Sequence, residues 1–239
     1  MSFKDFIIDS IKYSLQNKTN FLIFGLLLIV LAFLPEDVTD IDPSNLMISL
    51  PMSLITFFLI MIQAGYLTEV LMEIGKGSDI IPKFRDIRFY IIEGIKDWIL
   101  GIYYVIIPFS IIGILEVLTK EVLGDTLYVI LALLMFVSLY LFLLMLPTAI
   151  LYTVIDNYKK AFNLVYIFKR SREIGFKRLN FVLLVSVLIF AIISSIRVTN
   201  NDPVMSAIFV IVGFILYPIL TIMDLRYLAL IGREIMNKK

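Results

Sequence analysis

Apolar blocks without a charged residue alternate with charged segments along the chain. Six blocks are long enough to suggest helices in a membrane, at residues 21–34, 46–67, 98–115, 126–155, 179–196 and 203–223. A helix needs about 20 apolar residues to cross the hydrocarbon core of a bilayer. The pattern therefore predicts an all-α, polytopic integral membrane protein with six transmembrane helices. Because the first block is short for a span, we expect its helix to borrow from residues 17–20.

The composition agrees with this fold class and excludes several chemistries. The chain is 60% hydrophobic and 17% charged, whereas soluble proteins are about 25% charged. It has no cysteine and no histidine, which rules out disulfides, thiolate nucleophiles and Cys/His metal sites. Without a histidine base, a phosphate loop or a metal-ligand spacing, we expect no enzyme activity, cofactor or metal. A net charge of +1 indicates no nucleic-acid partner.

The positive charges lie on alternate segments between the blocks. Lysine and arginine number 21, and 19 of them fall in residues 1–19, 68–97, 156–178 and 224–239. The other three loops contain only Lys120 and Arg197. Cytoplasmic loops of membrane proteins carry an excess of lysine and arginine. The distribution predicts a multi-pass protein of the cell membrane with both termini in the cytoplasm.

A short motif recurs in two of the basic segments. Residues 6–12 read FIIDSIK and residues 90–96 read YIIEGIK, and each has apolar residues at helical spacing. A third segment, 159–172, matches them only in position and charge. We interpret all three as in-plane amphipathic helices at the cytoplasmic surface. The single membrane domain, 1–239, would then be a threefold repeat of helical hairpins, in units 1–78, 79–157 and 158–239. The alternative is chance resemblance between apolar loops.

A set of polar residues at the ends of the second and sixth blocks forms the candidate site. Its members are Gln63, Tyr66, Glu69, Glu73, Asp224 and Arg226. Acids near a membrane are costly unless they are paired or hydrated, so the set either marks a functional cluster or anchors helix ends in solvent. We hypothesise that Glu69 or Glu73 pairs with Arg226 or Arg233 and locks two helix ends together.

Three prolines fall inside predicted spans. Pro108, Pro147 and Pro218 each remove a backbone donor and should kink the helix that contains them. Such kinks are either tolerated structural features or hinges beside a polar cavity.

Residues 65–86, GYLTEVLMEIGKGSDIIPKFRD, and 91–108, IIEGIKDWILGIYYVIIP, resemble domain of unknown function 4013. The similar positions are Gly65, Tyr66, Leu67, the turn at Gly77-Ser78-Asp79, Pro82, Phe84, Gly94-Ile95-Lys96 and Pro108. A later segment at 157–168 is similar to a second recurring element. The resemblance covers residues 5–230 and implies a polytopic membrane protein, in a family with many members from methanogenic archaea. It implies no activity and no catalytic residue.

We interpret the chain as a non-catalytic membrane protein that organises or senses the cytoplasmic leaflet. Its partners would be membrane lipids, a membrane protein or a second copy of itself. The alternative is a small-solute or lipid transporter, because repeats and kinked spans occur in transporters. Against transport, every candidate acid lies near a helix end. A polar cavity that reaches the middle of the membrane would favour transport, and a dry interior would favour the first interpretation.

Overall fold

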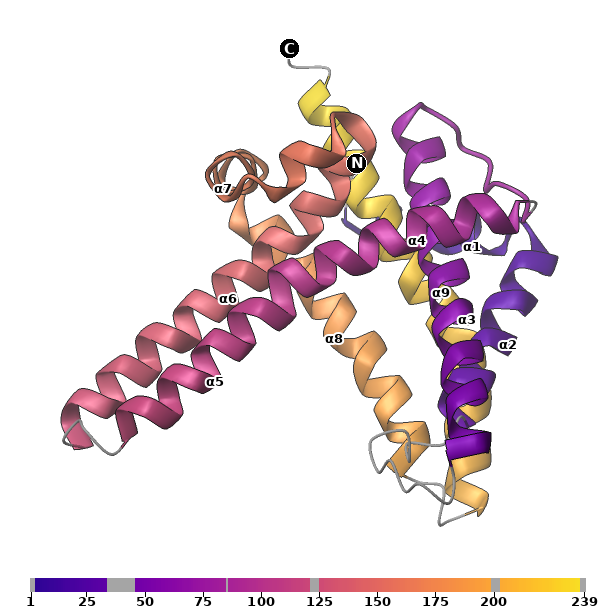
Figure 1. The fold of residues 1–239 in the computed structure, drawn as a ribbon. Coiled ribbons are helices and arrows are strands. Elements are labelled where there is room, and N and C mark those ends of the chain that lie inside the picture. Colours follow the sequence, from indigo (N-terminus) through magenta and orange to yellow (C-terminus); the bar gives the residue numbers. More distant parts are fainter. Residues whose placement is uncertain (1–2, 34–45, 85, 121–124, 199–202, 237–239) are drawn as a thin grey trace. The chain divides into compact units, whose positions relative to one another are not determined.

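A computed structural model describes residues 3–33, 46–84, 86–120, 125–198 and 203–236. These residues are mostly helical and include no strand (Figure 1). In chain order the helices are α1 (Phe3–Leu15), α2 (Lys18–Phe33), α3 (Leu46–Gly75), α4 (Ile87–Gly101), η1 (Ile102–Ile106), α5 (Ile107–Lys120), α6 (Asp125–Ile155), η2 (Tyr158–Phe162), α7 (Leu164–Ile174), α8 (Phe176–Val198) and α9 (Pro203–Met236). The all-α prediction is confirmed.

Five helical segments are long and apolar enough to cross a membrane. They are Ser53–Gly75, Ile87–Leu115, Tyr128–Ile155, Phe176–Ser195 and Ala207–Ile235. The first predicted span falls on α2, whose apolar stretch Lys18–Leu27 is shorter than a span, and residue 34 lies outside the described residues. A multi-pass membrane protein is therefore supported with five spans, and the sixth stays a prediction.

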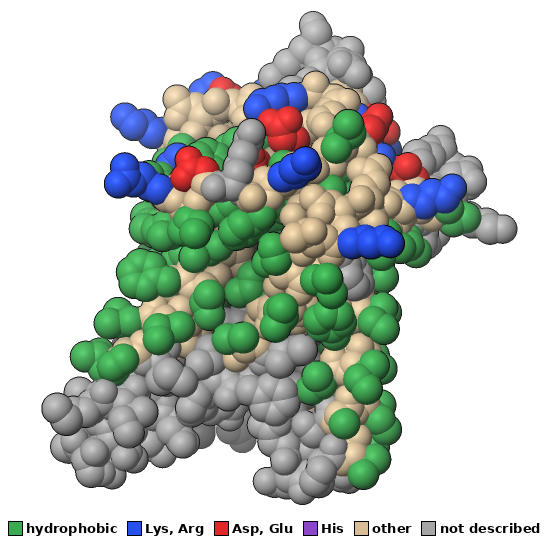
Figure 2. Space-filling model, turned by 90° about the vertical axis from the view of Figure 1, so that its right-hand side faces the viewer, with side chains coloured by type: hydrophobic (Ala, Val, Ile, Leu, Met, Phe, Trp, Pro, Cys, Tyr) green, Lys and Arg blue, Asp and Glu red, His purple; other side chains and the backbone are tan. Residues whose placement is uncertain are grey.

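The chain folds into two compact units. Unit 1 comprises residues 1–95 and 184–239, and unit 2 comprises residues 96–183. Unit 1 is organised around α9, because α1, α2 and α3 all pack against that helix. Figure 1 shows α2, α3 and α9 side by side. On the face that Figure 2 shows, charged side chains gather at one end and hydrophobic side chains cover the described surface below them.

Two glycines allow α3 and α4 to cross at close range within unit 1. A Cβ atom at Gly65 would lie 1.9 Å from the carbonyl oxygen of Tyr90, and one at Gly94 would lie 2.0 Å from that of Met61. No side chain fits at such distances, so each helix needs glycine where it meets the other backbone. Small residues permit this kind of close crossing between membrane helices.

Unit 2 contains α5 and α6, which lie side by side, with η2 and α7 packed against α6; the end of α4, η1 and the start of α8 also belong to it. Its buried core contains Leu100, Tyr104, Met145, Ala149, Tyr152, Ala161 and Ile167. Asn157 and Asn163 begin η2 and α7, and each side chain accepts a backbone N–H bond two or three residues on. These caps replace bonds that the first turn of a helix lacks.

The three predicted in-plane segments differ from one another. The first forms α1, which is separated from α2 at Gln16 and Asn17. The third forms η2 and α7. The second does not form a helix of its own, because α4 continues through η1 into α5 and belongs to the candidate span Ile87–Leu115. In-plane placement and the threefold repeat stay predictions.

A π-helical segment, η1, replaces regular α-helix just before Pro108. A proline cannot donate to the carbonyl four residues earlier, and its ring crowds that carbonyl. The wider π turn relieves this crowding and is a known cause of helix bending. Pro147 and Pro218 lie inside α6 and α9, which continue past them. The predicted kinks at the three prolines stay predictions.

Candidate functional site

Tyr66 is the centre of a buried polar cluster in unit 1. Its hydroxyl accepts a hydrogen bond from the Asn20 amide at 2.5 Å and donates to the Pro82 carbonyl at 2.9 Å. The same amide donates to Pro82 at 2.7 Å. Tyr66 is fully buried, so these bonds satisfy groups that could not reach water. They join the start of α2, the end of α3 and the segment that leads to α4.

Aromatic rings and one acid complete this cluster. The ring of Phe84 lies 5.4 Å from Tyr66 and 4.8 Å from Tyr90, between ring centroids. The Tyr90 hydroxyl donates to the Glu69 carboxylate at 2.7 Å. Glu69 is only 6% exposed, and a hydrogen bond to a buried carboxylate is among the stronger ones. Gly65, Tyr66, Pro82 and Phe84, which carry the family resemblance, therefore meet at one place.

Arg226 of α9 forms the second polar centre of unit 1. Its guanidinium lies 2.6 Å from the Asp9 carboxylate and 3.5 Å from that of Asp79. It also stacks over the ring of Tyr13, 4.3 Å from the centroid. The arginine side chain is only 7% exposed. Burial raises the pKa of the Tyr13 hydroxyl to about 12, although Arg226 acts in the opposite direction.

Arg233, two turns further along α9, binds the end of α3. Its guanidinium donates to the carbonyl of Ile74 and, at 3.3 Å, to that of Ser78. The last carbonyls of a helix have no partner in the helix and carry partial negative charge, so they attract a cation. A lock between α3 and α9 thus exists, but its chemistry differs from our hypothesis.

The hypothesis that Glu69 or Glu73 pairs with Arg226 or Arg233 is wrong for the described contacts. Glu73 instead pairs with Lys76 at 2.9 Å, one turn further along. The carboxylates that meet Arg226 come from α1 and the loop after α3, and sequence spacing gave no indication of that approach.

The other predicted residues bind elsewhere. The Gln63 amide donates to the hydroxyl of Tyr217, and Ser186 donates to Asp224 at 3.3 Å. The six predicted residues therefore divide among separate contacts of unit 1. Four important partners were missed: Asn20, Asp9, Tyr90 and Tyr217. The available signal was a polar or phenolic side chain inside or beside an apolar segment, which is common enough to be uninformative by itself.

These contacts join helices to one another within unit 1. Among the residues that the structure describes, no three acidic side chains come together in a way that could hold a metal ion. Glu69, Glu73, Asp9 and Asp224 accept hydrogen bonds from tyrosine, lysine, arginine and serine, respectively, on other turns or helices.

Unit 2 carries a surplus of positive charge at the end formed by η2 and α7, which we name the basic end (residues 156–178). Both of its acids are engaged: Asp156 with Lys160 at 2.9 Å, and Glu173 with Arg170 at 2.5 Å. Four further cations have no ion-pair partner among the described residues: Lys159, Lys169, Arg172 and Lys177. The basic end is therefore suited to an anionic partner.

The helix α7 holds this end in place. Its Ser171 hydroxyl donates to that of Thr148 on α6 at 2.9 Å, in a buried contact, and Ile167 beside it is fully buried. The opposite face is open: Val165 is 81% exposed and Phe168 is 42% exposed. Lys169 and Arg172 lie on that open face, because residues three or four apart share one side of a helix.

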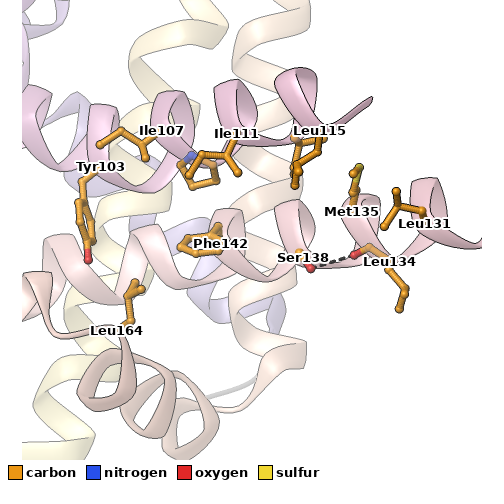
Figure 3. A pocket seen from close by; sticks show the side chains of 12 residues that line it. Tyr103, Ile107, Ile111, Leu115, Leu131, Leu134, Met135, Ser138, Phe142 and Leu164 are labelled. Carbon is orange, nitrogen blue, oxygen red and sulfur yellow. Dashed lines mark hydrogen bonds between the residues drawn. The ribbon is translucent and has the colours of Figure 1, made fainter. Parts of the chain in front are cut away.

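An apolar cavity of about 460 Å³ lies in unit 2, between η1 and α5 on one side and α6 on the other. Figure 3 shows Ile107 and Ile111 above it, with Ser138 and Phe142 below. Leu164, the first residue of α7, lines the same cavity. Several lining side chains are half-exposed, so the cavity opens at the surface of the unit.

The comparisons with known proteins place the chain in one family. No curated protein and no solved structure matches it. The model of the family described as "Protein of unknown function (DUF4013)" matches residues 48–223. That match covers α4 to α8, most of α3 and the greater part of α9. It agrees with the resemblance found at residues 65–108. The chain belongs to the DUF4013 family.

Proposed function

We propose that this chain is a non-catalytic integral membrane protein that binds anionic lipids of the cytoplasmic leaflet through its basic end, and so organises that leaflet. The observation that carries the proposal is the pairing pattern at the basic end. Its acids are both engaged, while four cations lack a partner among the described residues. An anionic headgroup supplies the missing negative charge.

The open face of α7 supports the same proposal. It combines exposed apolar side chains, Val165 and Phe168, with the cations Lys169 and Arg172. A helix at a membrane surface buries its apolar side chains among acyl chains and keeps its cations at the headgroups. The lysine and arginine distribution of the whole chain favours the cytoplasmic side for this end. Each cation near an anionic leaflet is worth about 1 kcal/mol.

Native mass spectrometry tests the headgroup preference. The protein is reconstituted in nanodiscs with equal phosphatidylglycerol and phosphatidylcholine, and the retained lipids are counted. We expect phosphatidylglycerol to be preferred. The double variant Lys169→Gln/Arg172→Gln should lose about tenfold or more of that preference, since two cations at about 1 kcal/mol each are removed.

A matched control removes the same charge from unit 1. Lys12→Gln/Lys83→Gln changes two exposed lysines and should keep the preference. An equal loss in both double variants would show a general charge effect and overturn the assignment to α7. Equal retention of the two lipids by the wild type would overturn lipid binding by charge altogether.

The side of the membrane is tested separately. Because the chain has no cysteine, single variants Lys76→Cys and Lys159→Cys can be labelled without background. Both should react with a membrane-impermeant maleimide only when the cytoplasmic face is accessible. Labelling of either one from the outer face of intact cells would contradict the proposed orientation.

A further inference from the structure

The cavity between α5 and α6 offers little to a polar solute. Its two polar side chains already have partners. The Tyr103 hydroxyl donates to the Phe162 carbonyl at 3.1 Å. The Ser138 hydroxyl donates to the Leu134 carbonyl at 2.8 Å (Figure 3). The other lining side chains are aliphatic, proline, methionine or phenylalanine. A buried water needs two to four polar partners, which this lining does not supply. The lining therefore favours hydrocarbon over a polar solute.

An empty cavity would be unfavourable inside a membrane. The volume of about 460 Å³ is typical of ligand sites, which span roughly 300–1,000 Å³. Without contents, the side chains along both helices would lose dispersion contacts on one side. Since the cavity opens at the surface of helices that are long enough to cross a membrane, lipid chains can reach it.

The length of the cavity matches one leaflet. It extends along the helix from Tyr103 to Leu115, and twelve residues at 1.5 Å each give roughly 18 Å. Half of a hydrocarbon core of about 30 Å is about 15 Å. One end is at Tyr103 and Leu164, and Leu164 begins α7, which belongs to the basic end. A lipid with its chain in the cavity would thus have its headgroup at the unpaired cations.

We propose that this cavity holds one hydrocarbon chain of an anionic membrane lipid whose headgroup lies at the basic end. The headgroup part rests on the function proposed above, whereas the chain part rests on the cavity alone. Lipid binding in unit 2 would then combine a charged contact with a fitted apolar one. Such a lipid should exchange more slowly than the lipids that surround the protein.

Two neighbouring leucines provide a matched test. Leu134 lines the cavity and Leu133 does not, yet the two are 60% and 61% exposed. Leu134→Trp places a large ring at the cavity, and Leu133→Trp makes the same change beside it. Lipid retention is measured by native mass spectrometry from nanodiscs of equal phosphatidylglycerol and phosphatidylcholine. We expect retained lipid to fall about tenfold in Leu134→Trp, which corresponds to about 1.4 kcal/mol, and to stay unchanged in Leu133→Trp.

A smaller residue at the same position shows whether the loss of lipid in Leu134→Trp comes from misfolding. Leu134→Ala enlarges the cavity and should retain lipid as the wild type does. If Leu134→Ala and Leu134→Trp lose lipid equally, the loss comes from disturbed folding and the cavity assignment is wrong. If the protein is a dimer that only Leu134→Trp dissociates, the cavity binds a second copy, and the lipid proposal is overturned.

The outcomes separate this inference from the proposed function. If Leu134→Trp retains lipid while Lys169→Gln/Arg172→Gln loses its preference, the cavity inference fails and the proposed function stands. If Leu134→Trp loses lipid but the wild type shows no preference for phosphatidylglycerol, the cavity holds a chain and the headgroup proposal fails. If neither variant differs from the wild type, both are overturned.

Discussion

Tyrosine hydroxyls join elements within each unit, but their partners differ between the two units. In unit 1, Tyr66 and Tyr90 bind the side chains of Asn20 and Glu69. In unit 2, Tyr103 and Tyr104 donate to backbone carbonyls of η2. Unit 1 also brings two backbones into contact at Gly65. It therefore depends on specific side chains and close packing, whereas unit 2 has a regular core beside an open apolar cavity.

The two units should therefore respond differently to substitutions. A network of buried polar bonds fixes one arrangement, because each broken bond leaves an unsatisfied group. In a cavity whose polar groups already have hydrogen-bond partners, the bound molecule can change without leaving a polar group unpaired. Unit 1 is accordingly the part that should be sensitive to small substitutions, and unit 2 the part that should accommodate a ligand.

The largest effect on stability is expected from a single methyl group added at the α3–α4 crossing. Gly65→Ala should lower the free energy of unfolding by about 3 kcal/mol, because its Cβ would lie 1.9 Å from a backbone oxygen. Gly113→Ala in α5 has open space around it and should raise that free energy by roughly 0.5–1 kcal/mol. Thermal unfolding in detergent measures both. Equal shifts for the two variants would mean that unit 1 is not the more tightly packed unit.

The two acids at Arg226 should differ in importance. Asp9→Asn should lower the free energy of unfolding by about 2 kcal/mol, as expected for a short hydrogen bond to a buried charge. Asp79 is 74% exposed and 3.5 Å away, so Asp79→Asn should cost less than about 0.5 kcal/mol. Unfolding titrations in mixed detergent micelles compare them. A larger effect at Asp79 would place the main partner of Arg226 in the loop and not in α1.

Two adjacent tyrosines in unit 2 should contribute unequally to its stability. The Tyr104 hydroxyl lies 2.6 Å from the Ala161 carbonyl and is buried, so Tyr104→Phe should cost about 1 kcal/mol. Tyr103 makes a longer bond of 3.1 Å in a less buried place, so Tyr103→Phe should cost less. Unfolding titrations in mixed detergent micelles measure the change in the free energy of unfolding for both variants. The reverse order would indicate that Tyr103 and not Tyr104 fastens η2.

The smallest expected effect concerns α7. A double-mutant cycle of Ser171→Ala and Thr148→Val isolates their hydroxyl contact. We expect a coupling of about 0.6 kcal/mol, the average for such bonds between membrane helices. Zero coupling would mean that packing by Ile167 and its neighbours, and not this bond, holds α7 on α6.

The fold class was predictable because apolar blocks of span length are a strong signal. The sequence also indicated that the segments around Gly65 and Gly94 belong to one family. It could not show that both glycines face a backbone, since that depends on where two helices cross. Nor could the sequence show that the segment at 90–96 continues as one helix through η1 into α5, because an amphipathic helix before a span and a continuous helix have the same local pattern.

The contacts of the candidate-site residues were not predictable from the sequence. Glu69 and Arg226 stood out because charges near a membrane are costly. Their partners Tyr90 and Asp9 come from other helices, and only the packing of α1 and α4 brings them near. The basic end was visible as a charge excess, yet which of its cations are unpaired depends on short contacts such as Asp156–Lys160. The cavity left no signal in the sequence, because its lining resembles any apolar helix.

The π-helical segment before Pro108 shifts the register of the helix that follows it, because a π turn is wider than an α-helical turn. Removal of one residue from Ile102–Ile106 would restore a regular helix and turn everything after it by about 100°. Ile107, Ile111 and Leu115 would then leave the wall that they now form together. One codon therefore decides which face of α5 meets α6, while composition and hydropathy hardly change. Relatives that carry or lack this extra residue should differ in whether they possess the cavity at all.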